Sequence, residues 1–357
     1  MINAYTIMMA IVVGAAYFMH GEKQFNKRYI IFSAIAMFIL MGFRDAYSVG
    51  NDSASSYLHT YEKITYQHWS QIFNSTGENK GFYILMKVIN AITDANYQIF
   101  IIVISAFIMI VIARFIYIYS CNPLQSIIYY WGLWFYIFNF NALKQALEMS
   151  IILLAYDMIQ KKKVVWFLLL VLLAMTFHKT AMVFIIAYWV VKLKPGRNFL
   201  LLLAAMLAFT YIFRSQMLDF MTGIYETTIY DTGRGFFANK VIIMIVIVAA
   251  GLILRPPEED DELYNNLLMF MGIAIVFQTF STYNNTFERL ADYYFQFAII
   301  FIPLVFQRKP LQRSYFQNEA TLNTIKQIAP VLFCGFGIWR MANQVLNDAT
   351  LRFKFCF

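Results

Sequence analysis

The residues with the clearest chemical potential are single charged side chains that interrupt long apolar runs. Arg44 ends one such run, and Asp52 and Tyr57 follow a turn predicted at Gly50–Asn51. A guanidinium group binds anions through paired N–H donors, and a carboxylate can accept a proton or pair with the arginine. The alternative is purely structural: an interfacial arginine anchor followed by a helix cap at Asp52.

A second polar group forms one face of a predicted helix. It has the spacing i, i+3, i+4, i+7 and consists of Asn141, Lys144, Gln145 and Glu148. Lys144 and Glu148 could simply pair with each other. A polar face in an apolar span must nevertheless point into the helix bundle, where Lys144 is available to an anionic ligand.

His178 stands between two apolar runs, in the sequence Thr176–Ala181. Such a histidine can hydrogen-bond to backbone carbonyls only, or it can move protons near neutral pH. It is the one histidine that we predict at membrane depth.

A second polar face, with the same helical spacing, comprises Arg289, Asp292, Tyr293 and Gln296. Its structural alternative is an Arg289–Asp292 pair within the helix. A further cation, Arg234, lies between two glycines in the loop 214–238, where a plain surface loop is the alternative. Two polar faces on different helices favour a shared cavity over isolated ion pairs.

The elements that carry these residues are membrane helices. Of the 357 residues 61% are apolar and 13% charged, whereas a soluble domain has about 25% charged residues. Mean hydropathy is +0.58. The composition therefore excludes a pair of soluble domains, and we interpret the net charge of +8 as basic cytoplasmic loops rather than nucleic-acid binding. The three distant cysteines predict no disulfide framework, and the four histidines lack metal-binding spacing, so we expect no cofactor and no metal.

We predict an all-α, polytopic transmembrane bundle of about twelve spans within one integral membrane domain, residues 1–357. The expected spans are 2–19, 28–43, 97–119, 124–140, 142–160, 163–177, 179–193, 197–213, 238–254, 264–283, 286–306 and 323–340. The first is expected to be a retained helix and not a cleaved signal. Residues 82–92 are too short to span and predict a re-entrant or interfacial segment.

Basic residues set the predicted orientation. The loops 20–28, 160–163, 192–197 and 307–322 each carry three Lys or Arg residues, and with twelve spans all four lie on the cytoplasmic side. The long segments 44–96 and 214–238 are then extracytoplasmic loops. The isolated charges also gather on the outer side: Arg44, Asp45, Asp52, Lys144, His178, Lys179, Arg234, Glu288, Arg289 and Asp292. We expect an outward cavity rich in cations, suited to phosphate or diphosphate.

Several of these motifs resemble the EpsG family of Wzy-like bacterial polysaccharide polymerases. Arg44–Gly50–Asp52–Tyr57 resembles the family's R…G-x-D…Y signature, and Phe177–Ala181 resembles its F-H-x-[ST]-A element. Lys144–Gln145 stands where the family has Arg-Gln, and Glu288–Arg289 with Tyr293 resembles its E-R…Y element. The chain departs from the family in having Lys144 in place of arginine. Glu78 also lies one residue early for the family's E-x-G-[YF] element, so no role is transferred to it.

The resemblance implies a multi-pass enzyme of the bacterial plasma membrane that joins repeat units carried on undecaprenyl diphosphate. The implied partners are this lipid-linked glycan, the bilayer, and the flippase and chain-length regulator of the same pathway. The residues expected to bind the diphosphate and substrate are Arg44, Lys144, Gln145, Arg234, Arg289 and Tyr293. Asp52 is the first candidate for the general base and His178 the second. The product, whether capsule, exopolysaccharide or O-antigen, is left open.

Two other classes of protein fit part of the pattern. A transporter of lipid-linked oligosaccharides would spread its charges through the membrane depth and show paired half-repeats, neither of which we find in the sequence. A membrane O-acyltransferase would also use a histidine at membrane depth, but it would not need several cations in one cavity.

Overall fold

The fold is helical wherever the chain is described. The computed structural model describes residues 3–19, 25–50, 52–74, 79–193, 195, 199–213, 215–216, 219, 239–254, 261–282, 285–307, 319–347 and 352–357. Within these residues β-pairing is limited to an isolated antiparallel bridge between Arg44 and Phe355. The prediction of an all-α fold is confirmed. The chain forms two compact units: unit 1 is Met1–Lys179 with Pro330–Phe357, and unit 2 is Thr180–Ala329.

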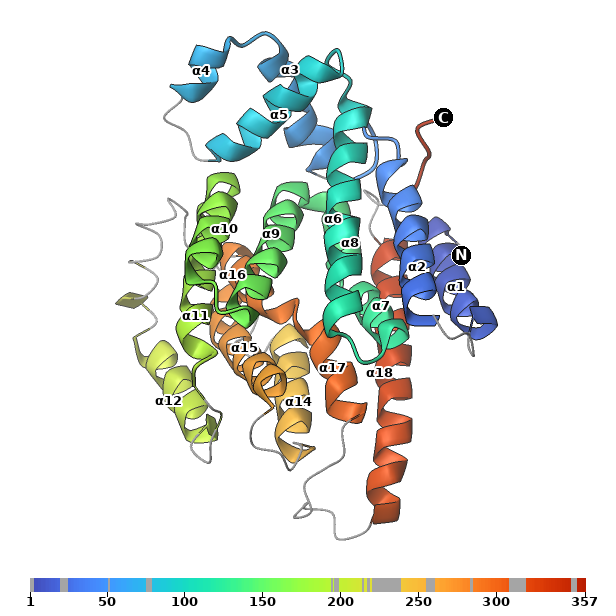
Figure 1. The fold of residues 1–357 in the computed structure, drawn as a ribbon, viewed down its shortest axis with the longest axis vertical. Helices are drawn as coiled ribbons and strands as arrows, with labels where there is room; N and C mark the ends of the chain where they lie inside the picture. The colour runs from blue at the N-terminus through green and yellow to red at the C-terminus, as the bar shows by residue number, and fades with distance from the viewer. Residues whose placement is uncertain are drawn as a thin grey trace. The chain divides into compact units, whose positions relative to one another are not determined.

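Unit 1 is built around α6 (Tyr97–Tyr119), the longest apolar helix of this unit. Asn96 caps its start by accepting a hydrogen bond from the backbone N–H of Ile99. The helix packs against α2 (Phe25–Gly42) and α9 (Leu143–Gln160), while α1 (Ala4–Met19) covers α2. A tight turn at 161–163 leads from α9 back along it as α10 (Val164–Phe177), so these two helices form an antiparallel hairpin (Figure 1).

The predicted span 124–140 is two short helices, α7 (Pro123–Gly132) and α8 (Phe135–Asn141). The break comes at Trp134, whose φ of 81° is left-handed and cannot continue a right-handed helix. Beside the break, α7 meets α18 (Glu319–Asn347) at two glycines: a Cβ on Gly132 would lie 2.5 Å from the Cα of Gly337. Small residues of this kind let two helix backbones touch. The helix predicted over 124–140 is therefore broken at Trp134, because hydropathy does not register this local turn, and its crossing of the membrane stays a prediction.

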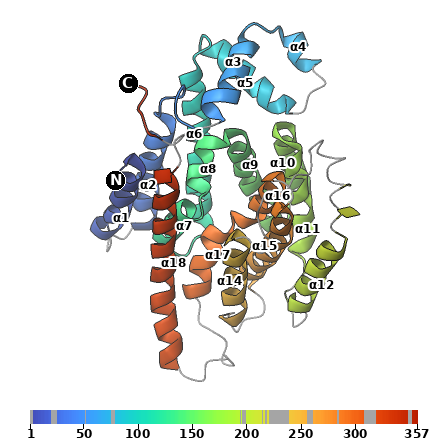
Figure 2. The ribbon, with the colours of Figure 1, turned by 180° about the vertical axis from the view of Figure 1, so that it is seen from behind.

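Four short helical segments fill most of the segment 44–96, which we predicted as a long loop. They are η1 (Ser53–Tyr57, one turn of π-helix), α3 (Leu58–Thr65), α4 (Trp69–Phe73) and α5 (Lys80–Ile92). We call residues 53–92 the cap, because these helices lie together at one end of α6 (Figures 1 and 2). The expectation that 82–92 is a short, non-spanning segment agrees with α5. The extracytoplasmic location of the cap stays a prediction.

Buried polar bonds hold the cap together. The ammonium group of Lys87 donates to the carbonyl oxygens of Ile64 (3.0 Å) and Thr65 (3.3 Å), at the end of α3. The side-chain amide of Asn90 donates to the Thr65 hydroxyl at 2.8 Å. The bonds from Lys87 satisfy carbonyls that a helix leaves open at its C-terminus, and together with the bond from Asn90 they fix α3 on α5.

A glycine joins the cap to the hairpin. Gly81, in the first turn of α5, packs on Thr176 at the end of α10, where a Cβ would lie 2.7 Å from the threonine Cβ and 3.1 Å from its carbonyl carbon. We expect Gly81→Ala to destabilise the protein by about 1–3 kcal/mol, the usual effect of forcing a methyl group into a packed contact. Thermal unfolding of the purified protein in nanodiscs measures this.

Gly14→Ala is the matched control, because no atom lies within 4 Å of a Cβ built there. It should leave the unfolding temperature unchanged or slightly raised, since alanine favours helix. Equal unfolding temperatures for Gly81→Ala and the wild type would show that the cap is not packed on α10 in this way.

Unit 2 is organised around α15 (Glu262–Thr279), which contacts α12 (Phe199–Ile212), α14 (Asn239–Ile253), α16 (Asn285–Phe295) and α17 (Ala298–Gln307). The chain enters this unit through a 3-10 helix, η2 (Lys179–Ile186), and the short α11 (Ala187–Val190). A further 3-10 turn, η3 (Phe280–Thr282), follows α15. The predicted span 179–193 begins as 3-10 helix, and the predicted span 286–306 bends by 45° between Phe295 and Ala298.

Few of the described helices are long enough to cross a membrane alone. Among the described residues one helix, α6, is long and apolar enough to cross a membrane alone, and α16 with α17 would be a second if the bent pair forms one span. Five further apolar helices have 10–17 residues. Because a helix rises 1.5 Å per residue and the hydrocarbon core is about 30 Å thick, such helices are short for a crossing. The prediction of twelve spans is not confirmed and stays a prediction.

Candidate active site

Arg44 is fully buried in unit 1, at the junction between α8 and α9. Its guanidinium donates to the backbone oxygens of Met41 (3.1 Å) and Phe140 (3.4 Å) and lies 4.7 Å from the centre of the Phe140 ring. Burial lowers the pKa of the guanidinium to about 10, an effect opposed by three nearby phenol groups, so the cation persists at neutral pH. These phenols belong to Tyr5, Tyr97 and Tyr136. Direct contact of Arg44 with a diphosphate therefore stays a prediction. Such a contact would require the guanidinium to move away from Phe140 and the three tyrosines.

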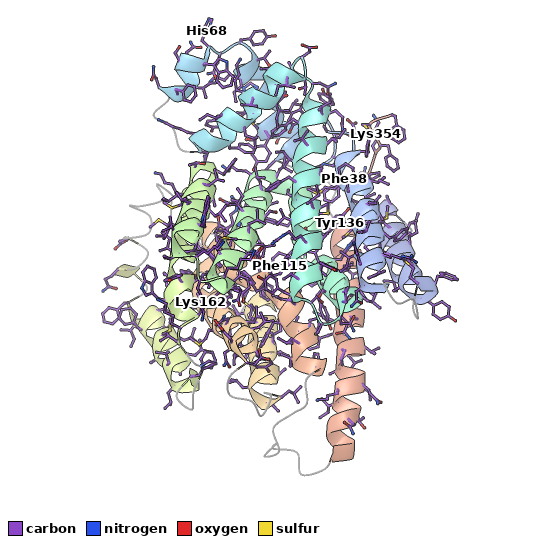
Figure 3. The ribbon with its side chains drawn as sticks, viewed as in Figure 1. Phe38, His68, Phe115, Tyr136, Lys162 and Lys354 are labelled. Atoms are coloured by element: carbon purple, nitrogen blue, oxygen red, sulfur yellow. The ribbon has the colours of Figure 1, made fainter. Side chains whose placement is uncertain are left out.

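The C-terminal segment 352–357, which we call the tail, pairs with the backbone around Arg44. The Asp45 N–H donates to the Lys354 carbonyl (2.7 Å), and the Cys356 N–H donates to the Phe43 carbonyl (3.0 Å). The Lys354 ammonium lies 3.4 Å from the Asp45 carboxylate. Figure 3 shows Lys354 beside the end of α2. The sequence contained no signal for this pairing, which fixes the backbone on both sides of Arg44.

Deleting residues 352–357 is expected to destabilise unit 1 by about 1–3 kcal/mol, since two backbone hydrogen bonds are lost and each contributes about 0.5–1.5 kcal/mol. Thermal unfolding of the truncated protein in nanodiscs measures this loss. Lys354→Ala is the control: this side chain is 73% exposed, so its ion pair contributes at most about 1 kcal/mol. If the truncated protein were as stable as the wild type, the tail would not be bound to this segment.

The polar face of α9 is placed beside His178 by the hairpin. Gln145 and Glu148 are buried, and Lys144 is half-buried. His178 ends α10 in an extended conformation (φ −160°, ψ 129°) and is half-buried. His178 follows Lys162, in the turn of the hairpin, at the same distance along the chain at which Ala146 precedes it. In an antiparallel hairpin two such residues lie at the same level, so we infer that His178 lies beside the turn of α9 that carries Gln145. In Figure 3, Lys162 lies far from His68 in the cap, as this arrangement requires.

Asp52 lies at the start of the cap. Gly50, the first residue of the predicted turn, has a φ of 97°, which uses the conformational freedom of glycine, while Asn51 lies outside the described residues. Asp52 is half-buried and precedes η1, but its side chain makes no capping hydrogen bond. The structural alternative for Asp52, a helix cap, is therefore wrong, and the role of general base stays a prediction.

In unit 2 the structure joins two of the sequence motifs. The hydroxyl groups of Thr180 and Tyr293 share a hydrogen bond of 2.8 Å, and Tyr293 is fully buried. The neighbouring Tyr294 donates to the carbonyl of Val183 at 2.7 Å. Thr180 belongs to the Phe177–Ala181 motif and Tyr293 to the motif that begins at Glu288. The two motifs are therefore in contact, as a shared site requires.

The acidic residues around Arg289 pair with a lysine from another helix. The ammonium of Lys240, at the start of α14, lies 3.0 Å from the Glu288 carboxylate and 2.6 Å from that of Asp292. The lysine and Asp292 are largely buried, with 15% and 10% of their side chains exposed. Lys240 therefore links α14 to α16 through both carboxylates. Arg289 itself is half-buried on the same helix as both carboxylates.

Arg234 lies outside the described residues, so its predicted role stays a prediction. Within the described part of the chain, no group of three or more His, Cys, Asp or Glu side chains is arranged to hold a metal ion.

The comparison with known families decides the class of protein. The family model of the EpsG family matches residues 27–344, nearly the whole chain. The chain belongs to the EpsG family. This is a family of Wzy-like polysaccharide polymerases of the membrane, and the resemblance inferred from the motifs is confirmed. No curated protein and no solved structure matches the chain.

For this member of the EpsG family, sequence reasoning missed Lys240 and the tail. Lys240 is a lone cation at the edge of the apolar run 238–254, and the rule that singled out Lys144 applies to it equally. The tail carries no motif, because its contacts with the Arg44 segment are made by backbone atoms.

Proposed function

We propose that the protein polymerises oligosaccharide repeat units carried on undecaprenyl diphosphate, at the outer face of the bacterial plasma membrane. Its family supports polysaccharide polymerisation in general. The observation that carries the proposal beyond the family is the Thr180–Tyr293 hydrogen bond, because it joins the motif of His178, a candidate general base, to the motif of Arg289 and Tyr293, candidates for substrate binding. The product would be an exopolysaccharide, a capsule or an O-antigen.

The proposed reaction is a glycosyl transfer. A hydroxyl group of the acceptor sugar attacks the anomeric carbon of the donor chain, the bond from that carbon to the diphosphate oxygen breaks, and the lipid diphosphate leaves. The hydroxyl proton passes to a general base, for which Asp52 is the first candidate and His178 the second.

Cations must stabilise the negative charge that develops on the leaving diphosphate. We assign this role to Arg289 and Lys144, with Gln145 and Tyr293 as hydrogen-bond donors and Arg234 as a further candidate. Such cations can take the place of a divalent ion, so we propose a reaction that needs no metal. The buried Arg44 is assigned to hold the α8–α9 junction, and thereby the start of the helix that carries Lys144.

Deleting the gene tests the proposal. Cells without the protein should lose long polysaccharide chains on a gel and accumulate single repeat units on the carrier lipid outside the membrane, and the wild-type gene should restore the long chains. Repeat units trapped on the inner leaflet would instead indicate a transporter. Unchanged chains in the deletion strain would refute the proposed function.

A further inference from the structure

The cap contains a cavity that the proposed reaction does not use. Its volume is about 270 Å³, and Ile64 and Ile72 contribute the apolar part of its lining. The polar part of its wall comes from three elements of the cap and includes His59, Lys63, Gln67, Gln71 and Tyr83. None of the described lining residues is acidic, so the cavity does not suit a metal cation.

The lining suits one sugar residue. A pyranose ring presents hydroxyl groups around its edge and C–H groups on its faces, so it needs hydrogen-bonding side chains around an apolar floor. Amide, imidazole, ammonium and phenol groups here provide both donors and acceptors. The volume lies just below the range of about 300–1,000 Å³ for drug-sized ligands, which indicates a single ring and not a chain.

The cavity is preformed, and most of its polar groups remain available. The bonds from Lys87 and Asn90 to the end of α3 fix two of its walls. Gln71 is already engaged, because its side-chain oxygen accepts from the His68 N–H at 2.8 Å. The side chains of His59, Lys63 and Gln67 form no hydrogen bond or ion pair with another residue that the structure describes.

The cavity lies at the end of unit 1 where His178 is found. Tyr83 stands two residues after Gly81, and Gly81 packs on Thr176, two residues before His178. A glycan that reacts near His178 can therefore extend across the cap.

We propose that this cavity is a glycan subsite that binds one sugar residue of the polysaccharide chain, away from the reacting sugar. The inference rests on the proposed function and adds a place where the enzyme holds its chain. A held chain stays longer on the enzyme between transfer steps, so the subsite favours long products.

The test uses the full-length protein in nanodiscs and oligosaccharides of two to six residues, made by partial acid hydrolysis of the polysaccharide from the same cells. Saturation-transfer NMR measures their binding. The wild type should bind them, and Gln67→Ala and Tyr83→Ala should each weaken binding about 3- to 10-fold, as expected when one hydrogen-bonding group is lost. Tyr66→Ala is the matched control, because Tyr66 is 87% exposed in the same cap and does not line the cavity.

A second measurement separates the subsite from the reaction. In cells, Gln67→Ala should shorten the chain-length distribution while polymerisation continues. Binding and chain length that both equal the wild type in Gln67→Ala and Tyr83→Ala would overturn the subsite and leave the polymerase function intact. Long chains in the gene-deletion strain would overturn the proposed function, and the subsite with it.

Discussion

Arg289→Ala is expected to abolish long polysaccharide chains while single repeat units on their carrier lipid persist. Arg289 is half-buried on α16, in the turn that also carries the fully buried Tyr293. Removing one donor that stabilises a developing negative charge typically slows a reaction about 100- to 1,000-fold. A loss of this size leaves no detectable ladder of long chains on a gel.

Two further variants test whether the effect is specific to the Arg289 guanidinium. Arg289→Lys keeps the charge but loses the planar fork that contacts two oxygens at once, so we expect partial activity and shorter chains. Arg28→Ala is the control, since Arg28 is an exposed arginine on α2 outside the candidate site. The level of each protein in the membrane must match the wild type, so that a loss of product is a loss of activity.

The outcome that contradicts the assignment is a normal ladder from Arg289→Ala. Loss of even single-unit material outside the membrane would support a transporter, because transport then fails before polymerisation begins.

Lys240→Met is expected to destabilise unit 2 by about 3–5 kcal/mol. The substitution leaves Glu288 and Asp292 without the cation that lies 3.0 and 2.6 Å from them. Breaking a buried ion pair by removing one partner costs about this much, because the remaining charge stays in a poorly solvated place. Thermal unfolding in nanodiscs and the amount of protein in the membrane measure the effect.

Compensating substitutions separate stability from activity. The triple variant Lys240→Met, Glu288→Gln, Asp292→Asn removes all three charges and should recover most of the stability, since uncharged replacements of a buried ion cluster are often tolerated. It should not recover polymerisation, because Arg289 then lies beside neutral groups in place of an ordered ion cluster. Lys161→Met, at an exposed lysine in the α9–α10 turn, should behave as the wild type. Equal stability of Lys240→Met and the wild type would show that α14 and α16 are not linked by this cluster.

Several candidate site residues could be predicted from polar residues spaced along a single helix. A polar face at helical spacing within an apolar run must point inward, and this rule selects Lys144, Gln145, Arg289 and Tyr293 from the sequence alone. The same reasoning could not select the partners of these residues. It offered only Arg289, on the same helix, as a partner for Asp292, and it did not select Lys240 from another helix, whose ammonium lies 2.6 Å from the Asp292 carboxylate.

Element boundaries were predictable where apolar runs end at polar residues. The limits of α6 agree with the predicted span 97–119, and those of α9 and α10 agree to within one residue with 142–160 and 163–177. Breaks inside apolar runs were not predictable, because hydropathy does not change at them. Trp134 turns the chain between α7 and α8 within such an apolar run. The bend of 45° between α16 and α17 lies instead at Gln296, beside the polar face of α16.

The sequence by itself therefore determined the class of this protein: helical, of the membrane, in the EpsG family, with scattered cations and carboxylates as candidate site residues. These conclusions depend on composition and short motifs, which are local properties of the chain. Only the tertiary structure decided that Arg44 is buried on Phe140, that the tail pairs with the backbone beside it, and that Thr180 bonds to Tyr293. Each of these is a contact between residues far apart in the chain, and its existence depends on how whole helices pack, which no short pattern encodes.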